Sequence, residues 1–421
     1  MEGVRRSEAC TRAGAKARRG REDGDAPGGG AATWSCLRLA SSAMGTRFEL
    51  VLVDDGRGDA RLRAAGESAL AEIAECDARL SRFRRDSAIA FIEREAVDRA
   101  VPLDEPTFAL FAEALDVWER SGGLFDLAVG GAMERWGLHP QSDRAARESD
   151  RDARGSDRAA RGPDRAAGAE ESAPAGDEPR SALDDEVRTT MPPFALDAAR
   201  RTIRLLRPDV HLDLGGIAKG HALDLAADVL REAGVRAALL HGGTSAIVAI
   251  GAPPEVDRLT TDAARRGAHV GAAMHAHAGI DARAGDDDHG HDHDHDHDDA
   301  CDDGWTIAIA AGSNGDADRP RLHVRLRDAA MCVSAPHGRV ADGAHHILDP
   351  RTGAPAALGE IAELAAIVGP RARGCDAWTK PALLRRTRPS GLPHDLTSIV
   401  IEAGRVDIQG PARDACCRLR P

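Results

Sequence analysis

Alternating polar and apolar residues predict a half-buried strand over residues 46–54, with Phe48, Leu50 and Leu52 on one side. The next apolar residues recur at intervals of three and four positions, which is the spacing of one helix face. They are Leu62, Gly66, Ala69, Ile73, Cys76 and Leu80. The patterned sequence therefore begins with a strand followed by an amphipathic helix that faces a core.

Strands and helices continue to alternate along the chain. A second helix is predicted after Pro106, with Phe108, Phe111, Leu115 and Trp118 on one face. The aromatic side chains of this face are more typical of a core than of a cofactor cage. A third is predicted over 217–233 and ends at Gly234. Strands are predicted over 237–240, 246–250, 322–326 and 398–402. The mixed order, without a repeat of about 20–50 residues, predicts an α+β (mixed α/β) body and excludes solenoids.

Low-complexity sequence interrupts this body twice. Residues 141–185 repeat Asp-Arg every seven positions with little to bury, and residues 252–304 contain a run of histidine and aspartate. Both are interpreted as tolerated surface insertions. The predicted organisation is a disordered segment over 1–38 and one folded domain over 39–410 that contains both insertions.

The charge of the chain is concentrated in the second insertion. Residues 286–303 contain ten aspartates and five histidines, and without these aspartates the net charge would be −3 rather than −13. A global basic field for nucleic acid is therefore excluded. The run His289–His297 could capture Zn, Ni or Cu weakly, but a solvated acidic loop is the favoured interpretation.

Neither a signal peptide nor a membrane span is predicted from the given sequence, and export is still open if translation starts elsewhere. No stretch reaches the roughly 18–20 apolar residues of a membrane span, and residues 1–36 lack the apolar run of a signal peptide. The eight cysteines form no CxxC pair, which excludes a zinc ribbon or a thioredoxin motif and suits a reducing compartment. A cytoplasmic location is favoured.

The most informative stretch, residues 211–220, is predicted to be a buried strand that enters a helix through Gly215-Gly216. Paired glycines let the backbone approach a ligand, and a helix N-terminus favours anions. Lys219 adds a charge suited to phosphate, and Asp213 could bind a hydroxyl, a base edge or a metal. The stretch is neither a Walker A motif nor a GxGxxG fingerprint, and a glycine turn used only for packing is the alternative.

Two further segments carry candidate chemistry. Residues 345–353 contain a tight turn, and a histidine three residues before its aspartate could act as a general base; a histidine that only caps the turn is the alternative. On a helix, Asp376 lies beside Thr379 and Lys380, so that a carboxylate and a hydroxyl could share a cation such as Mg²⁺. An exposed Asp–Lys helix pair is the alternative.

Taken together, these segments and their order resemble the ApbE-like family of FAD:protein FMN transferases. The matching pieces are Ala-Met-Gly-Thr at 43–46, Leu-Ser-Arg-Phe at 80–83 with Asp86-Ser87, Leu-Phe-Asp at 124–126 with Trp-Gly at 136–137, residues 213–220 with Asp224, Gly242-Gly243, His-Ile-Leu-Asp-Pro-Arg-Thr-Gly at 346–353, and Asp-Ala-Trp-Thr at 376–379. The resemblance covers about 41–140, 190–250 and 305–410. Both insertions fall between motifs.

The resemblance implies Mg²⁺-dependent transfer of FMN from FAD onto a Thr or Ser hydroxyl of a target protein, with release of AMP. The residues that it implies for FAD contact are Met44, Phe83, Phe125, Asp126, Asp213 and Lys219. The Gly216 carbonyl, Asp376 and Thr379 would hold Mg²⁺, and His346 would remove the proton of the acceptor hydroxyl. Exported members of the family are also expected.

The sequence departs from the family pattern at the metal segment. The family places the hydroxyl four residues after the aspartate, whereas here Thr379 follows Asp376 by three residues and Lys380 by four. A lysine there would repel Mg²⁺ or replace it electrostatically. Milder departures are Thr244-Ser245 after the glycine pair and Ser334-Ala335. The alternatives are hydrolysis of FAD to FMN and AMP, and a non-catalytic homologue that binds FAD or buffers metal.

Overall fold

The computed structural model describes residues 36–53, 58–138, 191–208, 210–253, 304–310, 321–336 and 344–411, with the backbone of strands at 9–10, 280–283, 340–341 and 417–420. Two compact units divide the chain. The first comprises residues 1–78, 217–335 and 362–421, and the second comprises 79–216 and 336–361. Each unit is therefore assembled from segments that are distant in the sequence.

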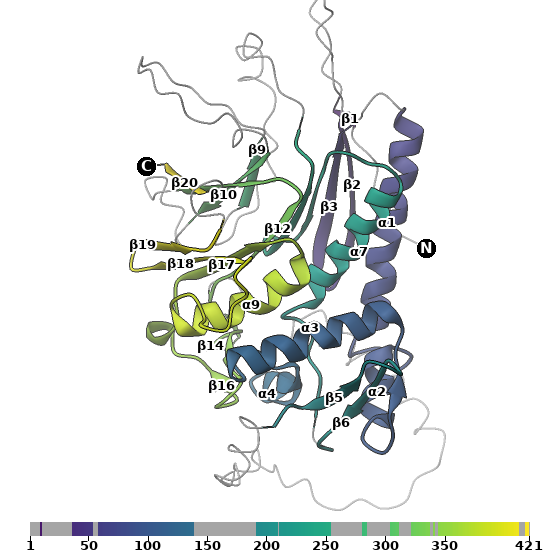
Figure 1. Cartoon of the computed structure of the whole chain (residues 1–421), viewed down its shortest axis with the longest axis vertical. Helices are drawn as coiled ribbons and strands as arrows, with labels where there is room; N and C mark the ends of the chain where they lie inside the picture. Colours follow the sequence, from purple (N-terminus) through teal and green to yellow (C-terminus); the bar gives the residue numbers. More distant parts are fainter. Residues whose placement is uncertain are drawn as a thin grey trace, which may run out of the picture. The chain divides into compact units, whose positions relative to one another are not determined.

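A nine-stranded sheet forms the centre of the first unit (Figure 1). Its strands in spatial order are β1 (Ala9–Cys10), β2 (Cys36–Ala43), β3 (Thr46–Val53), β7 (Ala238–Gly242), β8 (Ala246–Ile250), β12 (Ala329–Ser334), β17 (Leu364–Gly369), β18 (Thr397–Glu402) and β19 (Arg405–Gln409). All neighbouring pairs are antiparallel. Strand β3 confirms the predicted alternation, because Phe48, Leu50 and Leu52 are fully buried.

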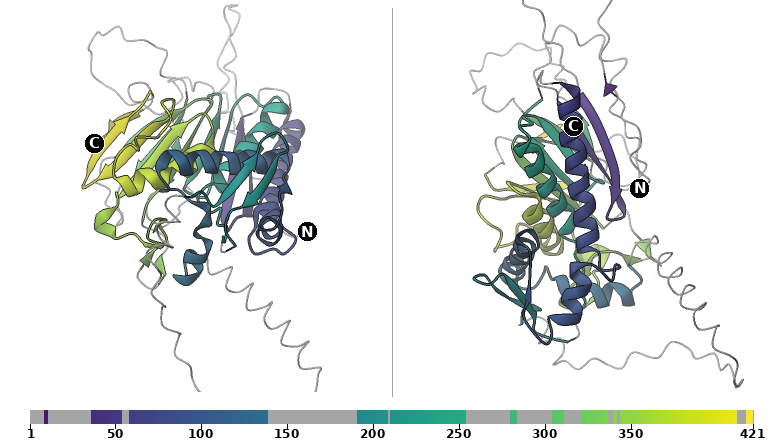
Figure 2. Two further views of the ribbon diagram at one scale, coloured as in Figure 1. Left: turned by 60° about the horizontal axis from the view of Figure 1, so that its bottom comes forward. Right: turned by 90° about the vertical axis from the view of Figure 1, so that its right-hand side faces the viewer.

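Three long helices pack against this sheet: α1 (Asp59–Leu80), α7 (Ala218–Glu232) and α9 (Ala372–Arg385). Helix α1, whose last two residues belong to the second unit, lies beside α7 (Figures 1 and 2), and Arg61 donates a hydrogen bond of 3.1 Å to the carbonyl of Ala233. A Cβ at Gly66 would meet Leu52 Cδ1 at 2.7 Å, so that glycine lets α1 approach the sheet closely. Helix α7 contacts β7 and β8, whereas α9 contacts β12 and β17.

A second, four-stranded sheet packs on the nine-stranded one through a shared apolar core. Its strands are β20 (Cys417–Arg420), β11 (Arg321–Leu326), β10 (Trp305–Ala310) and β9 (Ile280–Arg283). The indole of Trp305 also donates a hydrogen bond of 3.2 Å to the carbonyl of Ile250. Strand β9 lies inside the predicted insertion 252–304, so that this tract contributes a paired strand to the unit.

The second unit contains α2 (Ala88–Glu95), α3 (Glu105–Ser121) and α4 (Gly130–Arg135). A three-stranded sheet of β4 (Val101–Pro102), β6 (Thr202–Leu205) and β5 (Phe194–Asp197) accompanies them, and Phe194 packs edge-on against Phe111 with ring centroids 5.2 Å apart. Strands β15 (Leu348–Asp349) and β16 (Ala354–Pro355) form a small hairpin. The indole of Trp136 holds this hairpin through a hydrogen bond of 3.0 Å to the carbonyl of Gly353.

The predicted elements at 46–54, 62–80, 217–233, 237–240, 246–250, 322–326 and 398–402 are confirmed within a few residues. Three expectations need correction. Strand β2 already begins at Cys36, before the predicted start of the domain at 39. The buried face of α3 includes Phe111 and Trp118, but Phe108 and Leu115 are only half-buried. Residues 211–214 join no sheet of the described chain.

Residues 141–185 and the run His289–His297 lie outside the described residues. Among the helices that the structure describes, none is long and apolar enough to cross a membrane.

Candidate functional site

The first turn of α7 meets the Asp376 carboxylate in the first unit. Asp376 lies on α9 and is 1% exposed. Its Oδ2 accepts a hydrogen bond of 3.3 Å from the Gly220 amide, and Lys219 Nζ lies 4.0 Å from the same oxygen. The N-cap residue Ile217 makes no side-chain cap, so that Asp376 supplies an acceptor for the amides at this helix start.

Lys380 holds the other carboxylate oxygen. Its Nζ donates a hydrogen bond of 2.6 Å to Asp376 Oδ1 and one of 2.7 Å to the Asp376 backbone carbonyl. Pro381 follows inside the helix and has no amide to donate to the preceding turn. Burial lowers the pKa of Lys380, and the Asp376 carboxylate opposes that shift in part. Lys380 thus pairs with a carboxylate on its own helix.

Thr379 adds a hydroxyl to the same cluster. Its Oγ1 donates a hydrogen bond of 2.7 Å to the Asp376 carbonyl and lies 2.7 Å from the hydroxyl of Ser334 on β12. The structure therefore brings together the predicted residues Lys219, Asp376 and Thr379.

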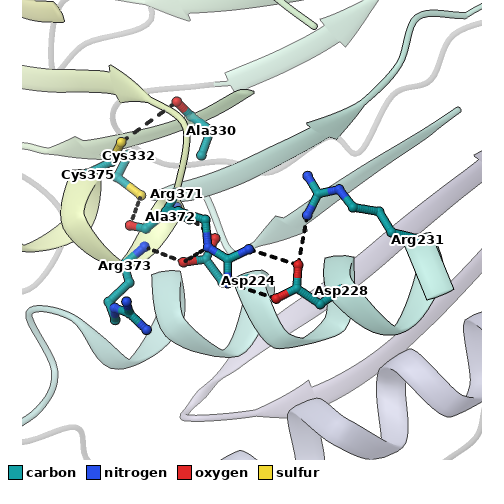
Figure 3. A network of polar contacts seen from close by, with 9 residues as sticks. All are labelled: Asp224, Asp228, Arg231, Ala330, Cys332, Arg371, Ala372, Arg373 and Cys375. Atoms are coloured by element: carbon teal, nitrogen blue, oxygen red, sulfur yellow. Dashed lines mark hydrogen bonds and ion pairs between the residues drawn. The ribbon is translucent and has the colours of Figure 1, made fainter. Parts of the chain in front are cut away.

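Helices α7 and α9 are held together by a second set of charges (Figure 3). Asp224 accepts hydrogen bonds from the amides of Ala372 at 2.8 Å and Arg373 at 3.0 Å, and so caps the start of α9. Burial nevertheless raises the pKa of Asp224. Arg371 donates two hydrogen bonds of 2.8 Å to Asp228, which fix the helix pair one turn further along α7.

Two buried thiols lie under the start of α9. Cys332 Sγ donates to the carbonyl of Ala372 at 3.4 Å, and Cys375 Sγ lies 3.9 Å from the carbonyl of Ala330 (Figure 3). Burial, with the Asp376 charge, raises the pKa of the Cys332 thiol well above its ordinary value. A buried thiol that stays protonated is a packing group rather than a nucleophile.

In the second unit, residues 211–216 run beside the turn that precedes α4. The amide of Gly130 donates to the carbonyl of His211 at 2.9 Å, and the amide of Asp213 donates to the carbonyl of Leu127 at 2.7 Å. The Asp213 carboxylate accepts the Gly215 amide at 2.8 Å. This stretch is held by short backbone pairing and by its own turn.

Arg82 is the functional candidate that the sequence reasoning missed. Its guanidinium donates to Asp213 Oδ2 at 3.3 Å and to Glu134 Oε1 at 3.0 Å, and it lies 5.6 Å from the centre of the Phe83 ring. Phe83 itself is 39% exposed. Arg82 is part of the motif at 80–83, but no periodicity marks it, and its partner Asp213 is 131 residues away.

Phe125 and Asp126 lie at the start of a short 3₁₀ helix, η1 (Leu127–Val129). The Asp126 carboxylate accepts the amide of Ala128 at 2.7 Å and caps this helix. Phe125 is buried, and its amide donates to Ser121 Oγ at 3.3 Å. Both predicted residues therefore have structural roles in addition to the contact with FAD that the resemblance implies.

His346 lies between β14 (Ala344–His345) and the β15–β16 hairpin and is half-buried. Within the hairpin, Asp349 accepts a hydrogen bond of 2.9 Å from the Arg351 amide and one of 2.6 Å from the Arg351 guanidinium. The contact with Asp349 raises the pKa of Arg351, and burial opposes this shift in part. Gly353 closes the turn at a φ of +64°. The turn next to His346 is thus fixed by its own residues.

The predicted site residues divide between the two units. Met44, half-buried in the turn between β2 and β3, belongs to the first unit with Lys219, Asp376 and Thr379. The second unit holds Phe83, Phe125, Asp126, Asp213, Gly216 and His346. The boundary between the units falls directly after the predicted metal ligand Gly216.

The cluster around Asp376 does not fit Mg²⁺. That ion prefers six oxygen ligands at about 2.0–2.1 Å. Here one oxygen of the carboxylate holds the ammonium of Lys380, and the second faces Lys219 and the Gly220 amide. Two ammonium groups against one carboxylate leave the position with a net positive charge, which repels a divalent cation. Among the described residues, no three His, Cys, Asp or Glu side chains gather as a metal site would require.

Curated relatives share the name FAD:protein FMN transferase. The protein of Treponema pallidum (strain Nichols) is 27% identical over 359 residues, which are 82% of this chain and 79% of that protein. The protein of Rhodobacter capsulatus is 33% identical over 149 residues, which are 35% of this chain but 23% of that protein.

Solved structures share the fold. The flavin transferase ApbE of Vibrio cholerae superimposes with a TM-score of 0.57 at 16% identity, covering 92% of this chain and 97% of that one. The ApbE protein of Thermotoga maritima gives 0.56 at 18% identity, covering 89% and 96%. The model of the ApbE family matches residues 44–262, just over half of the sequence. The chain, with its mixed α+β fold, belongs to the ApbE family.

Proposed function

We propose that this protein is a transferase that moves FMN from FAD onto a Thr or Ser hydroxyl of a target protein and releases AMP. The observation that carries the proposal is the similarity to the FAD:protein FMN transferase of Treponema pallidum, which extends over most of both chains. The family membership supports the transfer of FMN to protein. The type of acceptor hydroxyl rests on the sequence motifs.

The start of α7 is the proposed binding site for the diphosphate of FAD. A helix N-terminus presents amides and a partial positive charge to an anion. Lys219 in the first turn of α7 adds a full charge, and Asp376 orients it from 4.0 Å. The family motifs support the further proposal that Met44, Phe83, Phe125, Asp126 and Asp213 contact the nucleotide or the flavin.

His346 is proposed to remove the proton from the acceptor hydroxyl. The hydroxyl oxygen then forms a bond to the phosphorus of the FMN half, and the bond from that phosphorus to the bridging oxygen breaks. AMP leaves with the electron pair of that bond. Neutralising the charge on the diphosphate is the main requirement of such a transfer. The predicted Mg²⁺ has no part in this proposal, because the residues at Asp376 do not fit it.

The proposal is tested by incubating the purified full chain with FAD and a peptide or flavoprotein domain that carries candidate Thr and Ser acceptors. Covalent flavin fluorescence on the acceptor, with one AMP per flavin, is the expected result. AMP without labelled acceptor would instead indicate hydrolysis of FAD. Binding of FAD without either product would indicate a non-catalytic homologue, and both of these outcomes contradict the proposal.

A further inference from the structure

The charges at the start of α7 and on α9 form a site for an anion. One buried carboxylate, Asp376, faces two ammonium groups, Lys219 at 4.0 Å and Lys380 at 2.6 Å. The amide of Gly220 donates to the same carboxylate at 3.3 Å and adds the positive end of α7. Because the positive charges outnumber the negative one, the cluster attracts an anion such as a diphosphate.

Lys380 occupies the place that a cation would take on this carboxylate. Its Nζ contacts both Asp376 Oδ1 and the Asp376 carbonyl, two oxygens of the kind that bind a hard cation. Thr379 Oγ1 donates to that same carbonyl, and Ser334 lies next to the hydroxyl. The oxygens of the predicted metal segment are thus turned toward an ammonium group of the chain itself.

Lysine is rare in this sequence. Of its 56 basic residues, only Lys16, Lys219 and Lys380 are lysines, and the others are arginines. Two of the three lysines therefore meet at Asp376. An ammonium is a compact point charge that can donate to two oxygens of one residue while it faces an anion, whereas the planar guanidinium of arginine is wider. The side chains of Lys219 and Lys380 are both 20% exposed, so that each can be reached by a ligand.

We propose that Lys380 replaces the divalent cation in this protein: Asp376 holds Lys219 and Lys380 in place, and the two ammonium groups bind the diphosphate of the dinucleotide directly. This inference rests on the proposed function for the identity of the substrate. The binding of a diphosphate at this cluster does not depend on the proposed function, because it can be measured without any transfer.

The first test measures the binding of ADP, which carries the diphosphate, to the full chain by calorimetry in EDTA. We expect binding without metal, and an affinity that does not rise when Mg²⁺ replaces EDTA, because Mg²⁺ neutralises part of the charge on the diphosphate itself. Lys380→Met should weaken ADP binding about tenfold or more, since a charge-assisted hydrogen bond is lost. Thermal unfolding would verify that the variant is folded. Binding of ADP only with Mg²⁺, or unchanged binding by folded Lys380→Met, would overturn the inference.

A second test uses the scarcity of lysine. A short pulse of an acylating reagent in EDTA, read by mass spectrometry, reports the three lysines separately in the unmodified sequence. ADP should protect Lys219 and Lys380 relative to Lys16, which serves as the internal reference. This test needs no variant. If saturating ADP leaves the labelling of Lys219 and Lys380 unchanged relative to Lys16, the two lysines do not contact the diphosphate directly.

The third test compares flavin transfer by the wild type and by Lys380→Thr, which restores a hydroxyl four residues after Asp376. The wild type should transfer FMN equally in EDTA and in Mg²⁺, whereas Lys380→Thr should lose transfer in EDTA and regain it with Mg²⁺. Transfer by the wild type that requires Mg²⁺ would overturn the inference. If the wild type transfers nothing under either condition, the proposed function fails, and the ADP and labelling results alone decide on Lys380.

Discussion

At the scale of single residues, position 380 changes the charge of the site more than its shape. A threonine there would add a neutral oxygen, whereas Lys380 adds an ammonium 2.6 Å from Asp376 Oδ1. The carboxylate then serves to orient two cations of the chain, Lys219 and Lys380. The residues of the Mg²⁺ segment are present, but their charges favour an anion.

His346→Ala is expected to abolish flavin transfer and to leave FAD affinity within about twofold, because the imidazole is proposed to accept a proton and not to hold the dinucleotide. The rate would be followed by covalent fluorescence of the acceptor, and affinity by quenching of flavin fluorescence. The neighbouring substitution His345→Ala is the matched control and should retain transfer. Normal transfer by His346→Ala would refute the role of His346 as the base.

At the scale of elements, the contact between α7 and α9 positions the whole cluster. Lys219 and Gly220 lie in the first turn of α7, and Asp224 lies one turn later and caps α9. Asp376 is one turn beyond that cap on α9. The separation of these two helices therefore determines the distance between Lys219 and Asp376.

Gly220→Ala should destabilise the protein, because a Cβ there would lie 2.6 Å from the carbonyl carbon of Ala372 and 2.9 Å from the Arg373 amide. Alanine gains about 0.5–1 kcal/mol over glycine in a helix, but overpacking against backbone costs about 1–3 kcal/mol, so that the clash prevails. Denaturant unfolding measures the difference. Gly359→Ala, with open space around its Cβ, is the control and should change stability by less than about 0.5 kcal/mol.

Asp228→Asn should lower stability near neutral pH and have less effect in acid. Burial opposes the shift, but the hydrogen bonds and charge of Arg371 hold the pKa of Asp228 below its ordinary value of 3.8. Its stabilisation is therefore present above that value and is lost as the pH falls through the lowered pKa of the folded state. Because the pair is partly exposed, the effect should stay below about 1 kcal/mol. Unfolding at about pH 7 and about pH 3 measures it.

The double substitution Asp228→Asn with Arg371→Gln provides the control for that pair. Arg371 also lies 3.7 Å from the carboxylate of Asp224, so the second change should add at neutral pH only the loss of that contact. Equal effects of Asp228→Asn at both pH values would contradict the assigned role of Arg371.

Periodicity predicted α1 and α7, because each buries one continuous stripe against the sheet. It misplaced residues 211–214, since a short apolar run looks alike in a strand and in an irregular buried segment. Arg82 could not be predicted, because its partners Asp213 and Glu134 are joined to it only by the fold. The lysine at position 380 was visible in the sequence, but its contact with Asp376 required the structure.

At the scale of the whole molecule, the excess acidic charge and the proposed chemistry lie in different parts of the sequence. The ten aspartates of residues 286–303 account for most of the net charge of −13, whereas the residues that carry the proposed chemistry lie outside this stretch. Family motifs occur on both sides of this stretch.

Deletion of residues 286–303 is expected to leave flavin transfer and FAD affinity unchanged. The shortened protein should elute earlier from an anion exchanger than the wild type, because ten negative charges are removed, and should bind less Zn²⁺ or Ni²⁺, because five histidines are removed. Replacing the stretch by an equally long Gly-Ser segment controls for its length. Loss of transfer with unchanged FAD affinity in both proteins would show that these residues act in catalysis.

The ammonium of Lys380 on Asp376 also bears on how such a site can change over time. A side-chain cation is inherited with the gene and does not exchange with the solution, so that its presence is independent of the free magnesium that ATP and other chelators control. Lysine and threonine codons differ by a single base. One substitution at this position would therefore replace a metal ion that must be bound from solution by a charged side chain of the protein itself.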